Sequence, residues 1–425
     1  MIEEPLNYLD SLKSAGIRPG LGPVRRLLKR LGSPQDRFRS ILVGGTNGKG
    51  SIASSLACVL QAAGYRTGLY TSPHLVDFRE RIRLGGVPIP GEDLKALIRR
   101  VRGAAQEEVT YFEFSTALAF LHFAASPVDV AILEVGMGGR LDATNVVRPE
   151  LSVISNVAMD HTEHLGPRLA DIAREKAGII KTGRACVTAA RQAVVLEVLE
   201  TTCRRRRARL LRVGREIRVR SRPDGALDCT APGLAVRGLS LALRGGHQRE
   251  NAACVLGALG VLRERGFLIG DEAVREGLSG VRWEGRMEMV GMRPAVLLDG
   301  AHNPAGAAAL AKALGGIGYR RLILVLGVLA DKNWKGMLRR LVPRAHRVIL
   351  TRPPEDRALA PRILAGEARR WNRNVEIVDD PRQAMRAALQ GAGRSDLVCV
   401  AGSLYLVGAV RPLMIPSKGP GLVET

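Results

Sequence analysis

Aromatic residues are scarce in this sequence, because Phe, Trp and Tyr make up only 4% of its 425 residues. A surface that stacks nucleic-acid bases on aromatic rings therefore has little to work with. The chain also lacks any uncharged apolar run of about 18 residues, which excludes a conventional transmembrane helix. No basic segment followed by an apolar run opens the sequence, so we expect no signal peptide.

Paired cysteines are absent as well. The six cysteines are Cys58, Cys186, Cys203, Cys229, Cys254 and Cys399. They lie far apart without a CxxC pair, which is typical of reduced thiols and argues against a disulfide framework or a cysteine-based zinc site. Together with the missing signal peptide and membrane helix, this spacing predicts a cytoplasmic protein.

Acidic residues are outnumbered: 64 Lys and Arg against 41 Asp and Glu give a net charge of +23. Such an excess attracts polyanions, either nucleic acid or small molecules rich in phosphate or carboxylate groups, unless it reflects a basic proteome. Apolar residues at 46% and charged residues at 25% are ordinary for a globular protein and exclude a mainly disordered chain.

Short apolar runs alternate with helical patterns, which predicts mostly parallel sheets flanked by helices. In the first third, the expected strands are 40–43, 67–70, 128–133 and 151–155, with a helix over 51–63. A second, independent series has expected strands at 295–299, 321–327, 346–350 and 396–400, with a helix from residue 305. Between the two series, alternation and a turn over 215–243 favour a small antiparallel insertion.

A glycine-rich loop, GGTNGKGS at 44–51, lies between an expected strand and an expected helix. Glycines let backbone N–H groups approach phosphate oxygens, and a helix N-terminus favours negative charge. Lys49 can reach the β- and γ-phosphates, and the Ser51 hydroxyl can bind Mg²⁺. The match to the common phosphate-loop pattern is imperfect, because Val43 replaces its first glycine and Gly50 separates Lys49 from Ser51.

The two strand–helix series and this loop together define the expected fold class. We expect an α/β protein with an N-terminal P-loop mononucleotide-binding domain, built on a parallel sheet, over residues 1–292. A second, smaller Rossmann-like α/β domain is expected over residues 293–425.

Two acidic segments follow expected strands. Glu134 ends an apolar strand, where an acid commonly holds Mg²⁺ because ligands gather at the carboxyl ends of parallel strands. Residues 160–164 read DHTEH, two acids and two histidines. Zinc is not indicated there, because no cysteine is near and the segment reads as a loop.

Besides the loop, the sequence contains a series of further motifs between about residues 5 and 408. They lie at 71–75 (TSPHL), 79–82, 111–114, 134–145 (EVGMGGRLDATN), 160–161, 175–179, 246–252, 285–286, 298–304 (LDGAHNP), 331–332 and 402–405. The series resembles the folylpolyglutamate synthase/dihydrofolate synthase family, within the Mur-type ATP-dependent amide ligases. In this family the inserted Gly50 belongs to the phosphate loop, so the imperfect match becomes part of the resemblance.

The resemblance implies roles for individual residues. The nucleotide would be bound by Thr46, Asn47, Gly48, Lys49, Gly50 and Ser51 at its phosphates, and by Asn251, Arg286 and Asp299 from a cleft between domains. The implied Mg²⁺ ligands are Ser72, Glu134 and His161, with Ser51 a further candidate. Lys176 matches a lysine that this family carries as a carbamate, an anionic oxygen ligand suited to a hard metal. Lys49, Lys176 and His302 are the implied catalytic residues.

The implied substrate contacts on the pterin side are Gly16, Ile17, Arg18, Pro19, Phe112, Glu113, Arg140, Leu141 and Asp142. The implied reaction joins L-glutamate to dihydropteroate and to the γ-carboxylate of reduced folates through an acyl phosphate. ATP, Mg²⁺ as two ions, a carbamate on Lys176 and a monovalent cation are the expected cofactors. We expect a monomer without a membrane or specific nucleic-acid partner.

Four alternatives remain open at this point. The chain could only extend folate tails, or it could be another Mur-type ligase, although the phosphate loop starts too early for an extra N-terminal domain. It could be a basic P-loop protein that binds nucleic acid, which its net charge favours. Lastly, it could be a non-catalytic relative, because Asn333 stands where the family usually has Asp. Glu284 for Pro and Gly44 for Ala are lesser departures, and we do not assign His164 to metal.

Overall fold

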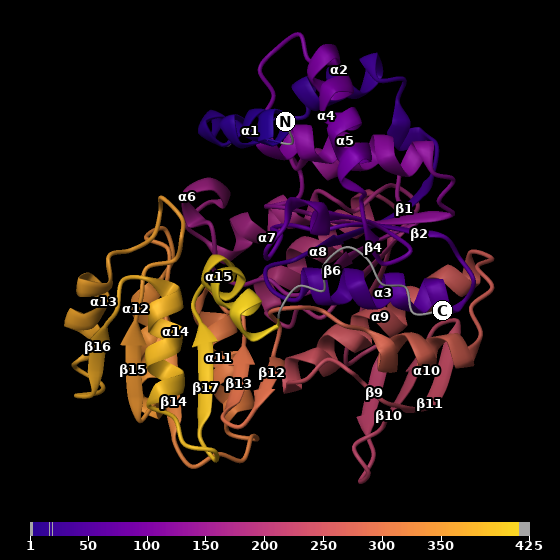
Figure 1. Ribbon diagram of the computed structural model, residues 1–425. Helices are drawn as coiled ribbons and strands as arrows, with labels where there is room; N and C mark the ends of the chain where they lie inside the picture. The colour runs from indigo at the N-terminus through magenta and orange to yellow at the C-terminus, as the bar shows by residue number, and fades with distance from the viewer. Residues whose placement is uncertain (1–2, 17, 19, 416–425) are drawn as a thin grey trace, which may run out of the picture. The chain divides into compact units, whose positions relative to one another are not determined.

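The computed structural model describes residues 3–16, 18 and 20–415, and they form two compact units (Figure 1). The first unit comprises the residues up to Leu243 together with Gln248–Arg282. The second comprises Arg244–His247 together with the residues from Trp283 onward. Each unit is built on its own sheet, so the expected α/β class with two strand–helix series is confirmed.

The first unit contains an eight-stranded sheet in the order β4-β3-β2-β5-β1-β6-β7-β8. Its strands are β1 (Arg39–Gly44), β2 (Thr67–Tyr70), β3 (Ile82–Leu84), β4 (Val87–Pro88), β5 (Val130–Glu134), β6 (Leu151–Ile154), β7 (Ala185–Thr188) and β8 (Arg209–Arg212). Only the pairings of β2 with β3 and of β3 with β4 are antiparallel. The parallel strands β1, β5 and β6 are almost wholly buried, as expected for strands covered by helices on both faces.

Helices cover both faces of this sheet (Figure 1). The helices of the first unit are α1 (Glu3–Ser11), α2 (Gly22–Arg30), α3 (Lys49–Ala62), α4 (Gly91–Ala104), α5 (Tyr111–Ala125), α6 (Thr162–Leu165), α7 (Leu169–Ala177), α8 (Ala193–Arg205), α9 (Gly246–Glu264) and α10 (Asp271–Gly280). Helix α5 is apolar around its circumference, and its Phe114, Leu118 and Phe120 are fully buried in the core. An apolar surface on all sides is what a buried helix requires.

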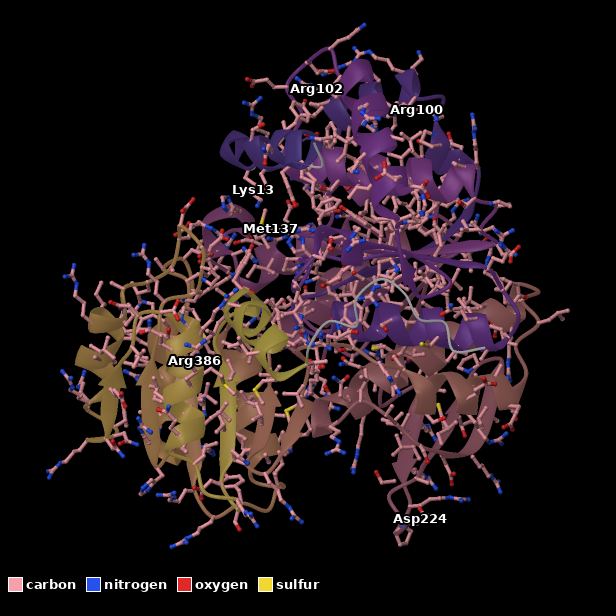
Figure 2. The ribbon with its side chains drawn as sticks, viewed as in Figure 1. Lys13, Arg100, Arg102, Met137, Asp224 and Arg386 are labelled. Carbon is pink, nitrogen blue, oxygen red and sulfur yellow. The ribbon has the colours of Figure 1, made fainter. Side chains whose placement is uncertain are left out.

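The expected antiparallel insertion is present as a three-stranded sheet. It consists of β9 (Arg218–Ser221), β10 (Leu227–Ala231) and β11 (Leu234–Leu239), in the order β11-β10-β9. Asp224 lies in the turn between β9 and β10, at the tip of the hairpin (Figure 2). Its carboxylate accepts a hydrogen bond from the Ala226 N–H at 3.0 Å, which helps to close the turn.

The second unit contains a six-stranded sheet in the order β12-β13-β17-β14-β15-β16. Its strands are β12 (Glu288–Met292), β13 (Ala295–Leu298), β14 (Leu322–Leu326), β15 (Arg347–Leu350), β16 (Val375–Ile377) and β17 (Leu397–Ala401). Its helices are α11 (Pro304–Leu314), α12 (Trp334–Leu341), α13 (Pro361–Ala368), α14 (Pro381–Gln390) and α15 (Leu404–Met414). All pairings except that of β12 with β13 are parallel.

The start of the second unit differs from the boundary expected between residues 292 and 293. The unit resumes at Trp283, because β12 pairs antiparallel with β13 and thereby extends the second sheet. The segment 283–292 precedes the first strand recognised in the sequence, so periodicity alone did not assign it. None of the helices in the described part of the chain combines the length and apolar content that a membrane span requires.

Candidate active site

The glycine-rich loop joins β1 to α3, as the sequence predicts. Gly48 adopts a left-handed conformation with φ of 84° and is the N-cap of α3, so Lys49 is the first helical residue. The unpaired backbone N–H groups at the start of this 14-residue helix favour an anion. The loop therefore has the backbone geometry that a phosphate group requires.

The segment that follows β6 holds this loop in place. Thr46 donates its N–H to the Asn156 carbonyl at 2.8 Å, and Asn47 donates its N–H to Asn156 Oδ1 at 3.0 Å. The Ser155 hydroxyl donates to the Asn47 carbonyl at 2.6 Å. Sequence reasoning missed Ser155 and Asn156, because only the pairing of β1 with β6 brings the two segments together.

Two glycines of the loop sit where a side chain does not fit. A Cβ on Gly45, whose φ is +128°, would overlap the Ser155 hydroxyl. A Cβ on Gly48 would overlap the Asn251 side chain on α9. Asn251 in turn donates to Gln248 Oε1 at 2.8 Å, and Gln248 lies 3.4 Å from the Ser51 hydroxyl. The structure thus brings Asn251 to the loop, and it adds Gln248, which the motif at 246–252 contained without an assigned role.

Two lysines converge on the loop. Lys49 Nζ donates to the Thr46 carbonyl at 3.2 Å, and Lys176 Nζ, from α7, donates to the Gly45 carbonyl at 2.8 Å. Lys176 is only 5% exposed. Burial, and then the charge of Lys49, lower the pKa of Lys176 to about 7, although Asp160 and Asp142 act in the opposite direction. The Lys176 amine therefore loses its proton far more readily than an ordinary lysine.

The expected metal ligands lie after neighbouring parallel strands. Glu134 ends β5 and is buried, and its Oε2 accepts the Ser72 N–H at 3.2 Å. His161 follows β6 and has a left-handed backbone with φ of 50°. The neighbouring Asp160 accepts the His161 N–H at 3.0 Å. The strands β2, β5, β1 and β6 are adjacent, so their carboxyl ends bring these residues to one edge of the sheet.

Within the described residues, no group of three or more His, Cys, Asp or Glu side chains could hold a metal ion. Mg²⁺ is compatible with such a sparse set, because it commonly binds one or two carboxylates together with phosphate oxygens and water. Glu134, the Ser51 and Ser72 hydroxyls and His161 therefore fit Mg²⁺ beside a bound nucleotide better than a metal held entirely by protein.

The residues expected on the substrate side are mostly engaged in local contacts. Glu113 closes a capping box at the start of α5, accepting the Thr110 N–H at 2.8 Å. Asp142 is buried and accepts N–H groups of Met137 and Thr144, each at 3.0 Å, while burial raises its pKa. Glu113 thus caps α5, and Asp142 fixes the backbone around residues 137–144. The sequence motifs did not indicate these structural roles.

The other expected substrate residues that the structure describes are half-buried or exposed. The Phe112 ring packs against Tyr70 at a centroid distance of 5.9 Å. Arg140 pairs with Glu175 at 2.8 Å, and the following Leu141 is half-buried. Gly16 and Arg18 are exposed, and Arg18 pairs with Glu108, which precedes α5, at 2.5 Å. Ile17 and Pro19 lie outside the described residues.

In the second unit, Asp299 follows β13 and is buried. It accepts the N–H groups of Met287 and Ala301, each at 2.9 Å. Burial raises the pKa of Asp299, although Arg286 acts in the opposite direction. His302 Nδ1 lies 2.8 Å from the Gly300 carbonyl. Because a carbonyl only accepts, Nδ1 carries the hydrogen, which fixes the tautomer of the ring.

Comparison with known proteins extends this description. The Mur ligase middle domain matches residues 43–259, and the Mur ligase, glutamate ligase domain matches residues 285–404. The dihydrofolate synthase/folylpolyglutamate synthase of Bacillus subtilis is 36% identical over 423 residues, which cover 96% of this chain and 98% of that protein.

Solved structures have the same fold. Escherichia coli FolC in complex with DHPP and ADP is similar with a TM-score of 0.90 and 32% identity, over 97% of each chain. The bifunctional folylpolyglutamate synthase/dihydrofolate synthase from Yersinia pestis complexed with AMPPNP and Mn ion has a TM-score of 0.87 and 31% identity, also over 97% of each chain.

Proposed function

Since this chain belongs to the folylpolyglutamate synthase/dihydrofolate synthase family of Mur ligases, we propose that it joins L-glutamate both to dihydropteroate and to the γ-carboxylate of reduced folates. It is an ATP-dependent ligase. The observation that carries the proposal is the convergence of the phosphate loop, Lys49, Lys176 and Glu134 at one edge of the first sheet.

The chemical problem is that a carboxylate is a poor acylating agent. In the proposed reaction, a substrate carboxylate oxygen attacks the γ-phosphorus of ATP, the bond to ADP breaks, and an acyl phosphate forms. The α-amine of glutamate then attacks the acyl carbon, loses a proton and expels phosphate. Transfer of this kind depends mainly on positioning and on stabilising the charge that develops on the phosphoryl oxygens.

The residues of this chain supply both requirements. The backbone N–H groups of 46–51 bind and orient the phosphates, and Lys49 supplies a positive charge beside them. Ser51, Ser72, Glu134 and His161 would hold Mg²⁺, which when bound offsets the repulsion between the anionic nucleophile and the γ-phosphate. Asn251 lies beside Gly48 and is proposed to contact the nucleotide.

In the second unit, Arg286 and Asp299 are proposed as nucleotide-binding residues, and His302 is proposed as a catalytic residue. On the pterin side, we propose contacts from residues 16–19, Phe112, Glu113 and 140–142. The capping role of Glu113 and the burial of Asp142 support fixed positions for these groups.

We also propose that Lys176 carries a carbamate. Its amine is buried, and no ion pair neutralises it among the residues that the structure describes. The charge of Lys49 acts on it unfavourably, whereas a carbamate anion there would be attracted to Lys49. Labelling with ¹³C-bicarbonate should give a carbamate resonance in the NMR spectrum that Lys176→Met abolishes. Its absence from the wild-type protein would contradict the modification.

Phosphate release from Mg-ATP and L-glutamate tests the main proposal. We expect phosphate release with dihydropteroate and with tetrahydrofolate. We expect none when both substrates are left out. Phosphate release with tetrahydrofolate alone would show an enzyme that only extends folate tails. No release with either substrate would overturn the proposal.

Lys49→Met should lower kcat about 100- to 1000-fold, since removing one group that stabilises developing charge commonly has an effect of that size. Lys95→Met, on the distant α4, is the matched control.

Three minor expectations are also proposals. We propose a monomeric enzyme, which light scattering during size-exclusion chromatography would test. We propose that it acts in the cytoplasm, which cell fractionation would test. For the monovalent cation we propose no ligands, and comparing K⁺ with Na⁺ in the assay would show whether one is required.

A further inference from the structure

Arg81 is a buried cation with no acidic partner among the described residues. It ends the short 3₁₀ helix η3 (Phe78–Arg81) and is only 7% exposed. Within the described part of the chain it forms no ion pair, whereas Arg79 on the same segment pairs with Asp77 at 2.6 Å and is exposed. Arginine is rarely buried unless it is paired, because removing its charge from water is costly.

The surroundings of the Arg81 guanidinium are aromatic rather than acidic. Its Nε–H donates to His74 Nδ1 at 2.8 Å. Its central carbon lies 5.6 Å from the ring centre of Phe78 and 5.2 Å from that of Tyr111, the first residue of α5. Lys13 Nζ lies 5.7 Å from the same Tyr111 ring. Rings of this kind hold a guanidinium in place without neutralising it.

The acids in this neighbourhood are already engaged. Asp77 pairs with Arg79, and Asp10 pairs with Lys13 at 2.8 Å. Glu80 accepts the N–H groups of Leu75, Val76 and Asp77 at 2.7, 3.1 and 2.9 Å. Among the residues that the structure describes, no carboxylate pairs with the Nη groups of Arg81. An anion that is bound from outside would supply the missing charge.

Arg81 is tied by its backbone to the proposed metal site. The Arg81 carbonyl accepts the Thr71 N–H at 3.0 Å. Ser72, which follows Thr71, donates its N–H to Glu134. The Arg81 side chain, however, makes no recorded contact with the phosphate loop at 44–51 in the described structure. This position suits a substrate group close to the reacting carboxylate but distinct from it.

We propose that Arg81 binds the α-carboxylate of the glutamate that a folate substrate already carries. This inference rests on the proposed function. Dihydropteroate has a single carboxylate, the one that reacts, whereas a glutamylated folate has an α-carboxylate in addition to the reacting γ-carboxylate. The planar guanidinium can bind a carboxylate through two parallel N–H···O bonds. Arg81 thus distinguishes tail extension from the first ligation.

Steady-state kinetics of Arg81→Gln with both substrates tests the proposal. We expect KM for tetrahydrofolate to rise about 10- to 100-fold, since a hydrogen bond to a charged group commonly has that effect. The KM values for dihydropteroate and ATP, and kcat with dihydropteroate, should remain unchanged. Arg79→Gln, which removes an exposed and already paired arginine from the same segment, is the matched control and should alter neither KM.

A modified substrate makes the test independent of folding defects. Tetrahydropteroyl-γ-aminobutyrate keeps a terminal carboxylate but lacks the α-carboxylate. Wild-type enzyme and Arg81→Gln should have the same KM for it. Should Arg81→Gln not fold, Arg81→Lys keeps the charge but loses the planar fork, and it should raise KM for tetrahydrofolate alone.

Several results would overturn the inference. One is an equal rise in the KM of Arg81→Gln for dihydropteroate and for tetrahydrofolate, which would not affect the proposed function. Another is a wild-type KM for tetrahydropteroyl-γ-aminobutyrate as low as that for tetrahydrofolate. If the wild-type enzyme used neither natural substrate, the proposed function itself would fail, and the two failures are therefore distinguishable.

Discussion

Asn333 shows how one side chain can be read differently once its neighbours are known. It stands where the family usually has Asp, which raised the alternative of a non-catalytic relative. In the structure it is the N-cap of α12, and its Oδ1 accepts the Gly336 N–H at 3.1 Å. Asn and Asp are about equally good caps, so this contact gives no reason to expect that the substitution removes activity.

The cap leads to a prediction about Asn333. Asn333→Asp should leave the rate of phosphate release unchanged, because either side chain satisfies the first turn. Asn333→Ala should lower the free energy of unfolding by about 1 kcal/mol, as measured by urea denaturation. A several-fold gain in kcat for Asn333→Asp would instead show that a negative charge is needed there.

His122 is a second residue with an effect that burial decides. It lies on α5, 5% exposed, and its Nε2 has no hydrogen-bond partner among the described residues. Burial lowers its pKa from the ordinary value of 6.5, although Asp93 acts in the opposite direction. As pH falls through the unfolded pKa, the unfolded chain therefore binds more protons than the folded one, and stability is lost.

We therefore expect the free energy of unfolding to fall as the pH drops from about 6.5 toward 5. His122→Phe keeps a buried ring without a titrating group, so its stability should fall less steeply over the same range. Chemical denaturation at several pH values would measure the difference. Parallel curves for the two proteins would show that His122 does not contribute.

At the scale of elements, the site depends on one strand–loop–helix unit and the segment after β6. Gly45 illustrates the dependence, since its φ of +128° and the nearby Ser155 hydroxyl leave no room for a side chain. Gly64, which follows α3, also has a positive φ, +88°, but has nothing within 4 Å of a built Cβ. A substitution at Gly64 therefore tests backbone strain alone, whereas one at Gly45 adds a steric clash.

Gly45→Ala should weaken ADP binding at least tenfold, because the loop must move away from Ser155 and its N–H groups lose their alignment. Gly64→Ala carries only the cost of a left-handed alanine, roughly 1 kcal/mol of stability, and should bind ADP normally. Isothermal titration calorimetry and thermal unfolding measure the two effects. Normal ADP affinity in Gly45→Ala would show that the loop tolerates displacement.

At the scale of the whole molecule, the net charge of +23 favours nucleic-acid binding, whereas the low aromatic content argues against it. The excess of positive charge attracts any polyanion, but few rings are available to stack bases. The phosphate loop, by contrast, is a specific site for a small phosphate-bearing ligand. We therefore expect nucleic acid to be bound only through unspecific charge attraction.

Gel-shift assays across a salt series test this expectation. Retention of DNA or RNA should be weak and independent of sequence, and it should disappear as salt rises toward about 200 mM because released counterions no longer favour binding. ADP affinity, measured in the same buffers, should change much less. Tight binding that survives at high salt would favour the nucleic-acid alternative.

Local patterns in the sequence were sufficient for much of the fold. Each expected strand overlaps an observed one, from β1, β2, β5 and β6 to β13, β14, β15 and β17, because buried parallel strands are short, continuous apolar runs. The strands β3, β4, β7, β8, β12 and β16 were not expected from the sequence. β12 is the example at the start of the second sheet. It is an antiparallel edge strand that packs through its pairing with β13, and such strands carry little pattern of their own.

The sequence by itself determined the phosphate loop, the acid that ends β5 and the family, since these depend on residue type and order along the chain. Only the tertiary structure decided which groups meet. It placed Lys176 beside Lys49, Ser155 against the loop, and Arg81 in a buried aromatic surrounding without an acid. Charge and burial depend on neighbours distant in sequence, so strand order and helix packing had to be known first.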